Sequence, residues 1–251
     1  MPRTKSAEPK KPKAPKPPKA PSLSRTKVER FRECPRCFYL QEKHKVSRPP
    51  GPGFSINSAV DTLLKKEFDI HRAAGTPHPL MTAAGLNAVP FAHEDIHLWR
   101  NQFKRVGLRI THDATGWEIF GYPDDIWQDR DSGELLVVEY KATAKSGEVN
   151  ELDPKWHDPY KYQVSFYQWL LRRKGFAVSP QAWFLFANGS SAPERFDGCM
   201  QFRMTLFPYE PDDSWIEPTL RKIKETLESD QPPEAPESCS WCDYGRKSGA
   251  L

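Results

Sequence analysis

The segments GYPD at residues 121–124 and VVEYK at residues 137–141 decide the expected fold. An Asp-Ser-Gly turn at 131–133 lies between them, and the apolar run at 135–138 predicts a central strand buried on both faces. Adjacent antiparallel strands place Asp124 beside Glu139 at one end of a sheet. The spacing therefore predicts two carboxylates close together at a strand end.

The acid-X-Lys pattern adds a chemical expectation to this pair. Glu139 and Lys141 are two residues apart on a strand, so their side chains leave the same face. Charges at the end of a buried strand are costly unless a partner compensates them, and Mg²⁺ binds a few carboxylates while keeping several waters. A lysine beside that cation orients water or accepts its proton, which is metal-assisted hydrolysis. The simpler alternative is a solvent-facing salt bridge, which is favoured for an isolated Glu-X-Lys, whereas the place of this one after GYPD favours the metal site.

Two expected helices bring further candidates to this site. Gln163 and Tyr167 are four residues apart and share the helix face that points back to the lysine, although a surface glutamine and a core-edge tyrosine are the alternative. On the preceding helix, Asp61 lies at the border of the apolar face. It either completes the shell of the cation or pairs with Lys65 one turn later.

Apolar periodicity and turn residues predict an α/β fold. Gly75 and Gly175 end two of the expected helices, and Ser24 is the expected N-cap at the start of the folded part. We expect helices at 24–33, 55–74, 95–105, 159–174 and 214–229, and strands at 107–112, 117–128, 134–141, 182–187 and 200–207.

Four of the five cysteines form CxxC pairs near the two ends of the chain. Cys34 and Cys37 precede the expected core, and Cys239 and Cys242 follow it. Two such pairs suit tetrahedral coordination by four sulfurs, either of Zn²⁺ or of an iron–sulfur cluster, and spacing does not separate these two. Cys199 is expected to be buried in a strand.

The charge of the chain is concentrated at its N-terminus. Residues 1–27 contain nine Lys or Arg and one acid, which gives +8, so the other residues carry 4 − 8 = −4. We expect residues 1–23, rich in Lys and Pro, to be a disordered tail that either tethers nucleic acid or merely solvates the chain. The chain has no secretory signal and no apolar run near the roughly 20 residues that a membrane span needs, so we expect a cytoplasmic protein.

These motifs together resemble the PD-(D/E)XK nuclease superfamily, in particular its RecB-like branch and the CRISPR-associated adaptation exonucleases. That branch shows a Gly-X-X-Asp hairpin, an acid-X-Lys strand and a Gln-X-X-X-Tyr helix, in the order found here. The resemblance implies a restriction-endonuclease-like core (α-β-β-β-α-β) within a domain at 24–251, whose mixed central sheet is flanked by helices. A cysteine metal clip would join the segments at 24–53 and 231–251.

The resemblance also implies residue roles. Asp124 and Glu139 would bind Mg²⁺ or Mn²⁺, Lys141 would activate or orient water, and Gln163 and Tyr167 would support the site. The activity implied is hydrolysis of phosphodiester bonds in DNA, with RNA still open, in DNA repair, recombination or defence, alongside a helicase or another partner. The alternative is a catalytically silent nucleic-acid-binding or scaffolding module on the same fold.

This sequence differs from the pattern of that branch in two ways. Its upstream helix usually presents a histidine to the metal, whereas Asp61 occupies that place here. Relatives with a 4Fe–4S cluster have one cysteine before the core and three after it, whereas this chain has two and two, with Ser248 where a third late cysteine is expected. Cys37 would then supply the fourth thiolate.

Overall fold

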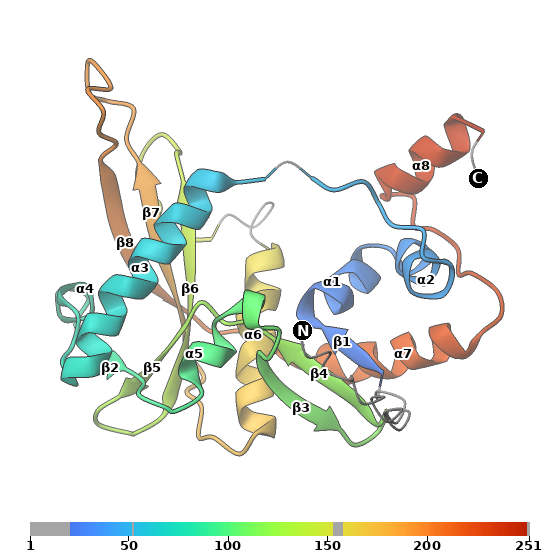
Figure 1. Cartoon of the computed structure of the whole chain (residues 1–251), viewed down its shortest axis with the longest axis horizontal. Helices are drawn as coiled ribbons and strands as arrows, with labels where there is room; N and C mark the ends of the chain where they lie inside the picture. The colour runs from blue at the N-terminus through green and yellow to red at the C-terminus, as the bar shows by residue number, and fades with distance from the viewer. Residues whose placement is uncertain (1–20, 52, 153–157, 250–251) are drawn as a thin grey trace, which may run out of the picture.

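The computed structural model describes residues 21–51, 53–152 and 158–249. Its strands form two sheets (Figure 1). Within the five-stranded sheet β6 and β7 run parallel and the other neighbours run antiparallel, so this sheet is mixed. Its order is β2 (Ala88–Pro90), β5 (Asp125–Asp129), β6 (Leu135–Thr143), β7 (Ala182–Gly189) and β8 (Phe202–Tyr209). The three-stranded sheet has the order β1 (Ser22–Ser24), β4 (Trp117–Gly121) and β3 (Leu108–His112).

Helices α3 (Ser55–Ala74) and α6 (Asp158–Arg173) cover opposite faces of the five-stranded sheet (Figure 1). The central strand β6 is buried on both faces, as its apolar run predicts. Val137 packs in the core on the α6 side, whereas Val138 packs with Phe68 of α3 on the other side. Because side chains alternate along a strand, Glu139 and Lys141 face the α6 layer.

A helical lobe joins the two ends of the described chain. It contains α1 (Arg25–Glu33), α2 (Pro35–His44), α7 (Ile216–Glu228) and α8 (Ser240–Lys247), and α7 packs against both α1 and α2. These helices lie together on the side away from β7 and β8 (Figure 1). The shorter elements α4 (Pro79–Ala83), α5 (Ile96–Trp99) and the 3-10 turn η1 (Gln102–Lys104) lie between α3 and β3 in the chain.

The expected α/β fold, with a mixed sheet flanked by helices, is confirmed. The Ser24 side chain caps α1 by accepting from the N–H of Lys27, and Gly75 ends α3 in the left-handed conformation that glycine adopts readily. The strand β1 begins two residues before the expected start of the folded part. No helix in the described ranges is long and apolar enough to span a membrane.

Three local expectations are wrong. The strand expected at 117–128 is two strands in different sheets, because Pro123 has no N–H for a ladder and the chain crosses between the sheets there. The helix expected at 95–105 is only α5 and η1, separated by Asn101, whose side chain accepts from the N–H groups of the next turn. Cys199 is exposed in the loop before β8 rather than buried in a strand.

Candidate active site

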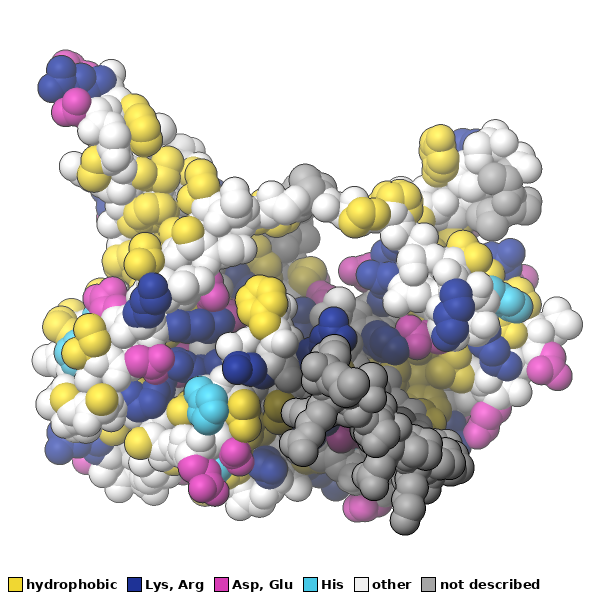
Figure 2. Space-filling model, viewed as in Figure 1, with side chains coloured by type: hydrophobic (Ala, Val, Ile, Leu, Met, Phe, Trp, Pro, Cys, Tyr) yellow, Lys and Arg dark blue, Asp and Glu magenta, His cyan; other side chains and the backbone are white. Residues whose placement is uncertain are grey.

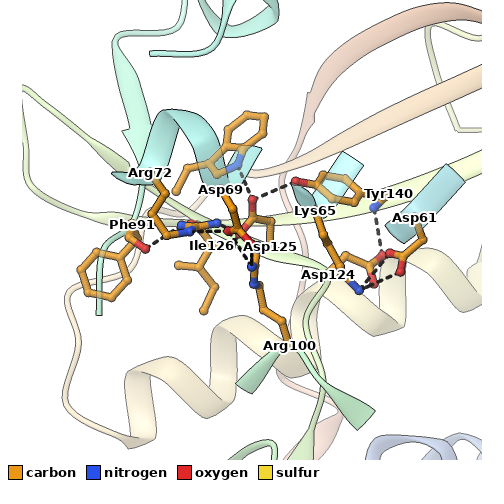
Figure 3. Close-up of polar contacts among 11 residues, drawn as sticks. Asp61, Lys65, Asp69, Arg72, Phe91, Arg100, Asp124, Asp125, Ile126 and Tyr140 are labelled. Atoms are coloured by element: carbon orange, nitrogen blue, oxygen red, sulfur yellow. Dashed lines mark hydrogen bonds and ion pairs between the residues drawn. The ribbon is translucent and has the colours of Figure 1, made fainter. Parts of the chain in front are cut away.

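The crossing at GYPD places the first acid. Asp124 directly precedes β5, and Asp125 pairs with Val138 in the antiparallel register, so Asp124 lies opposite Glu139 at the end of the sheet. The N–H of Tyr140 donates to Asp124 Oδ2 at 3.0 Å, which fixes that carboxylate against β6 (Figure 3). The structure therefore brings the two acids together by strand register, as the spacing predicts.

Glu139 and Lys141 form a short chain of contacts toward α6. Lys141 Nζ lies 2.6 Å from Glu139 Oε1 and 3.0 Å from Gln163 Oε1. Glu139 is only 2% exposed, and its second oxygen, Oε2, is buried with no hydrogen-bond partner among the described residues. A buried carboxylate oxygen without a donor is unfavourable unless a cation completes it.

The electrostatics of Glu139 point the same way. Burial, and then the neighbouring Asp124 carboxylate, raise the pKa of Glu139 to about 7, while Lys141 opposes the shift. The charged form of the Glu139 carboxyl therefore needs more positive charge nearby than the Lys141 ammonium group supplies. The donor set of two carboxylates lining one hollow fits a hard divalent cation such as Mg²⁺ or Mn²⁺.

Tyr167 supports the turn that carries Asp124. Its ring lies directly against Gly121, where a β-carbon would come within 2.5 Å of Tyr167 Cε1. Burial raises the pKa of Tyr167, which therefore stays neutral, and its hydroxyl contacts the Gln163 side chain. The glycine of GYPD thus makes room for the tyrosine four residues after Gln163.

Asp61 reaches the same hollow from α3. Lys65 Nζ lies 2.9 Å from Asp61 Oδ1 and 3.5 Å from Asp124 Oδ1, so one ammonium group links the two acids (Figure 3). Burial, and then the Asp124 charge, raise the pKa of Asp61. Both interpretations of Asp61 are therefore compatible with its position, because it pairs with Lys65 and also faces the site.

A buried network beside the site was not found from the sequence. The Asp125 carboxylate is fully buried and accepts from Arg72 Nη2 at 2.5 Å, Arg100 Nη1 at 3.0 Å and the Tyr140 hydroxyl at 2.8 Å (Figure 3). Both arginines also bind Asp69 on α3. The available signal was Asp125, the aspartate that directly follows GYPD, because strand alternation turns it to the face opposite Glu139.

Two hollows open on either side of Asp124. The larger, about 950 Å³, is lined by Asp61, Glu139 and Lys141, and the smaller, about 710 Å³, by Arg25 and Tyr167. Lys and Arg side chains gather over the middle of this face, around α3 and α5 and toward the lobe of α1 and α2 (Figure 2). Lys65, Lys66, Arg100 and Lys141 line the larger hollow together with four carboxylates, so basic side chains that can contact a phosphate lie beside the acids.

The comparisons with known proteins identify the family. A family model for the PD-(D/E)XK nuclease superfamily matches residues 59–246, which is most of the chain. The chain belongs to this superfamily. The match spans Asp124, Glu139 and Lys141 and ends beyond Cys242, but it begins after Cys37.

Two further comparisons add little to the family. A solved structure from Eubacterium rectale named as a "Putative exonuclease" shares 13% identity, with 90% of this chain and 88% of that chain covered. Its TM-score of 0.41 is too low to carry an argument. No curated protein matches this chain.

In this nuclease-superfamily chain the four paired cysteines also meet. Cys34 precedes α2 and Cys239 precedes α8, and the four sulfurs of Cys34, Cys37, Cys239 and Cys242 lie within 4.8 Å of one another. All four are buried. Burial raises the pKa of Cys34 and Cys242, whereas at Cys239 hydrogen bonds outweigh burial and lower the pKa to about 7. Four thiolates this close repel one another, so a bound cation would stabilise all four in the charged form. The cluster fits a metal ion, as the paired spacing predicts.

Proposed function

We propose that this chain hydrolyses phosphodiester bonds in DNA with the help of Mg²⁺ or Mn²⁺. The observation that supports this most directly is the buried Glu139 Oε2, which has no donor within the described ranges and lies beside Asp124. A scaffold protein gains nothing from an uncompensated carboxylate at that position. The superfamily assignment makes a nuclease the natural use of such a pair.

Each residue would have a distinct task. Asp124 and Glu139, with Asp61 from α3, would hold the cation, which would polarise the scissile phosphate and supply a bound water. Lys141, held by Gln163, would orient that water or accept its proton. Tyr167 would keep GYPD in place through its contact with Gly121.

The motifs also suggest the biological process in which the nuclease acts. The order of the hairpin, strand and helix motifs suggests the RecB-like branch, which suggests DNA repair, recombination or defence and a helicase or similar partner. All five cysteines are free of disulfides, which suits a reducing cytoplasm. A basic tail attached to the nuclease domain would end before Ser22 rather than at residue 23, because β1 begins at Ser22 and pairs with β4. Residues 1–20 lie outside the described residues.

Cleavage assays with purified protein test the proposal. Single- and double-stranded DNA and RNA of one sequence are incubated with Mg²⁺, with Mn²⁺ and without either cation. We expect DNA cleavage only with a divalent cation, and a loss of at least about 100-fold in Glu139→Gln. The exposed Glu94 provides a matched control, because Glu94→Gln makes the same substitution away from the hollow.

A catalytically silent binding or scaffolding module is the alternative function. It predicts DNA binding with no cleavage under any of the three conditions. That result, or equal cleavage by the wild type and Glu139→Gln, would overturn the proposal.

A further inference from the structure

The separations among the four cysteine sulfurs carry information about what they bind. The Sγ atoms of Cys34 and Cys242 are 3.8 Å apart, those of Cys37 and Cys239 are 3.7 Å apart, and those of Cys37 and Cys242 are 3.5 Å apart. All four sulfurs lie within 4.8 Å of one another. They form one compact group rather than two distant pairs.

This compactness matches a single metal ion. In a tetrahedral site with metal–sulfur distances of about 2.3 Å, neighbouring sulfurs are separated by about 3.8 Å. On a four-iron cubane, each thiolate binds a different corner, which separates the sulfurs by about 6 Å. The 4Fe–4S cluster that the family resemblance suggests therefore does not fit these four side chains as they stand.

The surrounding structure holds the sulfurs at this separation. Cys34 is the N-cap of α2 and accepts from the N–H of Cys37 at 3.4 Å, and Cys239 is the N-cap of α8. Both CxxC pairs thus begin a helix, where the helix dipole stabilises negative sulfur. The two cap positions therefore bring the sulfurs of both pairs together where α2 and α8 begin.

A guanidinium group lies against the cluster. Arg48 Nη2 lies 3.8 Å from Cys239 Sγ, and Arg48 Nη1 binds Glu33 Oε2 at 2.6 Å. Four thiolates around one divalent ion leave a net charge of −2, which a neighbouring arginine partly offsets. Arg48 therefore lies where its guanidinium group would stabilise the thiolate of Cys239 when an ion is bound.

We propose that Cys34, Cys37, Cys239 and Cys242 bind one zinc ion, which clips the segment at 24–53 to the segment at 231–251. Zinc is favoured over a single iron because it binds four thiolates more tightly than Fe²⁺ and prefers a closed tetrahedral shell. The ion is structural, since all four coordination positions are filled by protein. It is distinct from the divalent cation at Asp124.

Metal and sulfide analysis of the full chain tests this. The protein is purified anaerobically from cells supplied with both iron and zinc. We expect about one zinc ion per chain, no acid-labile sulfide and no visible absorption, and Co²⁺ exchange should give the spectrum of a tetrahedral thiolate site. Iron with sulfide would overturn the proposal in favour of a cluster, and iron without sulfide would overturn the choice of zinc.

Cysteine variants separate a bound clip from adventitious metal. Cys37→Ser should lose most of the zinc and lower the melting temperature by about 5 °C or more, because the ends of the chain are then no longer joined. Cys199→Ser is the matched control, since Cys199 is exposed and outside the cluster, and it should keep both zinc and stability. Full zinc content and an unchanged melting temperature in Cys37→Ser would contradict the clip, whatever the outcome of the cleavage assays.

Discussion

The raised pKa of Glu139 predicts that the stability of the protein depends on pH. The pKa of Glu139 is raised to about 7, mainly by burial, so the folded state holds a proton that the unfolded state releases near the ordinary value of 4.5. Stability contributed by protonated Glu139 is present below that ordinary value and is lost as pH rises through about 7. A divalent cation bound to the carboxylate should reverse this loss, because it stabilises the charged form.

Glu139→Gln should remove this pH dependence. As pH rises from 5 to 8 without added Mg²⁺, the unfolding free energy of the variant relative to the wild type should increase by on the order of 2 kcal/mol. Urea denaturation of both proteins at each pH measures the difference. Parallel pH profiles for the two proteins would show that the Glu139 proton is not linked to folding.

Substitution of Gly121 tests the contact beneath the turn that carries Asp124. In Gly121→Ala the new β-carbon would lie 2.5 Å from Tyr167 Cε1, so the tyrosine or the turn must move. We expect a destabilisation of about 1–3 kcal/mol together with lower activity. Gly53→Ala is the control, because no atom lies within 4 Å of a β-carbon built there. Equal stability of the two variants would argue against the Gly121–Tyr167 contact.

Spacing predicts that some candidate site residues lie together, but does not predict this for others. The proximity of Asp124, Glu139 and Lys141 is predictable because strand register and side-chain alternation depend on residues close in sequence. Arg100 was missed because its partners, Asp69 and Asp125, are distant in sequence and meet only through tertiary packing.

At the scale of elements, the Asp125 network fixes α3 on the sheet. Arg72 comes from α3, Arg100 follows α5 and Asp125 begins β5, so three segments converge on one buried carboxylate. Since α3 also carries Asp61 and Lys65, its position determines how these two side chains meet Asp124 (Figure 3).

Asp125→Asn should loosen this attachment. It leaves two buried guanidinium groups without their shared carboxylate, so we expect a loss of about 3 kcal/mol of stability and reduced cleavage. Asp213→Asn is the control, because Asp213 pairs with Arg172 at a partly exposed site, where an ion pair contributes less than about 1 kcal/mol. Equal losses in the two variants would contradict the anchoring role of Asp125.

The elements differ in how well sequence predicts them. The bounds of α3 were predicted in full, because a long apolar periodicity ends at a glycine. The three-residue strands β1 and β2 were missed, since they carry no pattern of their own and exist only by pairing with β4 and β5. Pro123 lies inside the strand expected at 117–128, and a proline within a strand indicates a break. The sequence therefore contains the information that this segment is two strands.

For the whole molecule, the basic N-terminus should affect binding more than chemistry. Deletion of residues 1–20, which lie outside the described residues, should weaken DNA binding and flatten its salt dependence, because fewer counterions are released. The deletion stops before Ser22 so that β1 stays paired with β4. DNA binding of the wild type and the deletion is measured across a salt series. The deletion should leave the cleavage rate at saturating DNA unchanged. An unchanged slope of affinity against salt concentration would assign the tail another role.

The joining of the two chain ends was also only partly predictable. Two CxxC pairs indicate a shared metal, but their sulfur separation depends on how α2 and α8 pack, which no spacing rule gives. The choice between zinc and a cluster therefore required the three-dimensional structure.

The single-turnover rate of DNA cleavage by Lys141→Ala at saturating Mn²⁺ tests the central claim most directly. Lys141 contacts both Glu139 and Gln163, and we assign it to the attacking water rather than to the fold. The rate should fall by about 10²–10⁴-fold while circular dichroism and DNA affinity stay close to those of the wild type. Cleavage at the wild-type rate by a folded Lys141→Ala protein would contradict the assignment of this site as the catalytic centre.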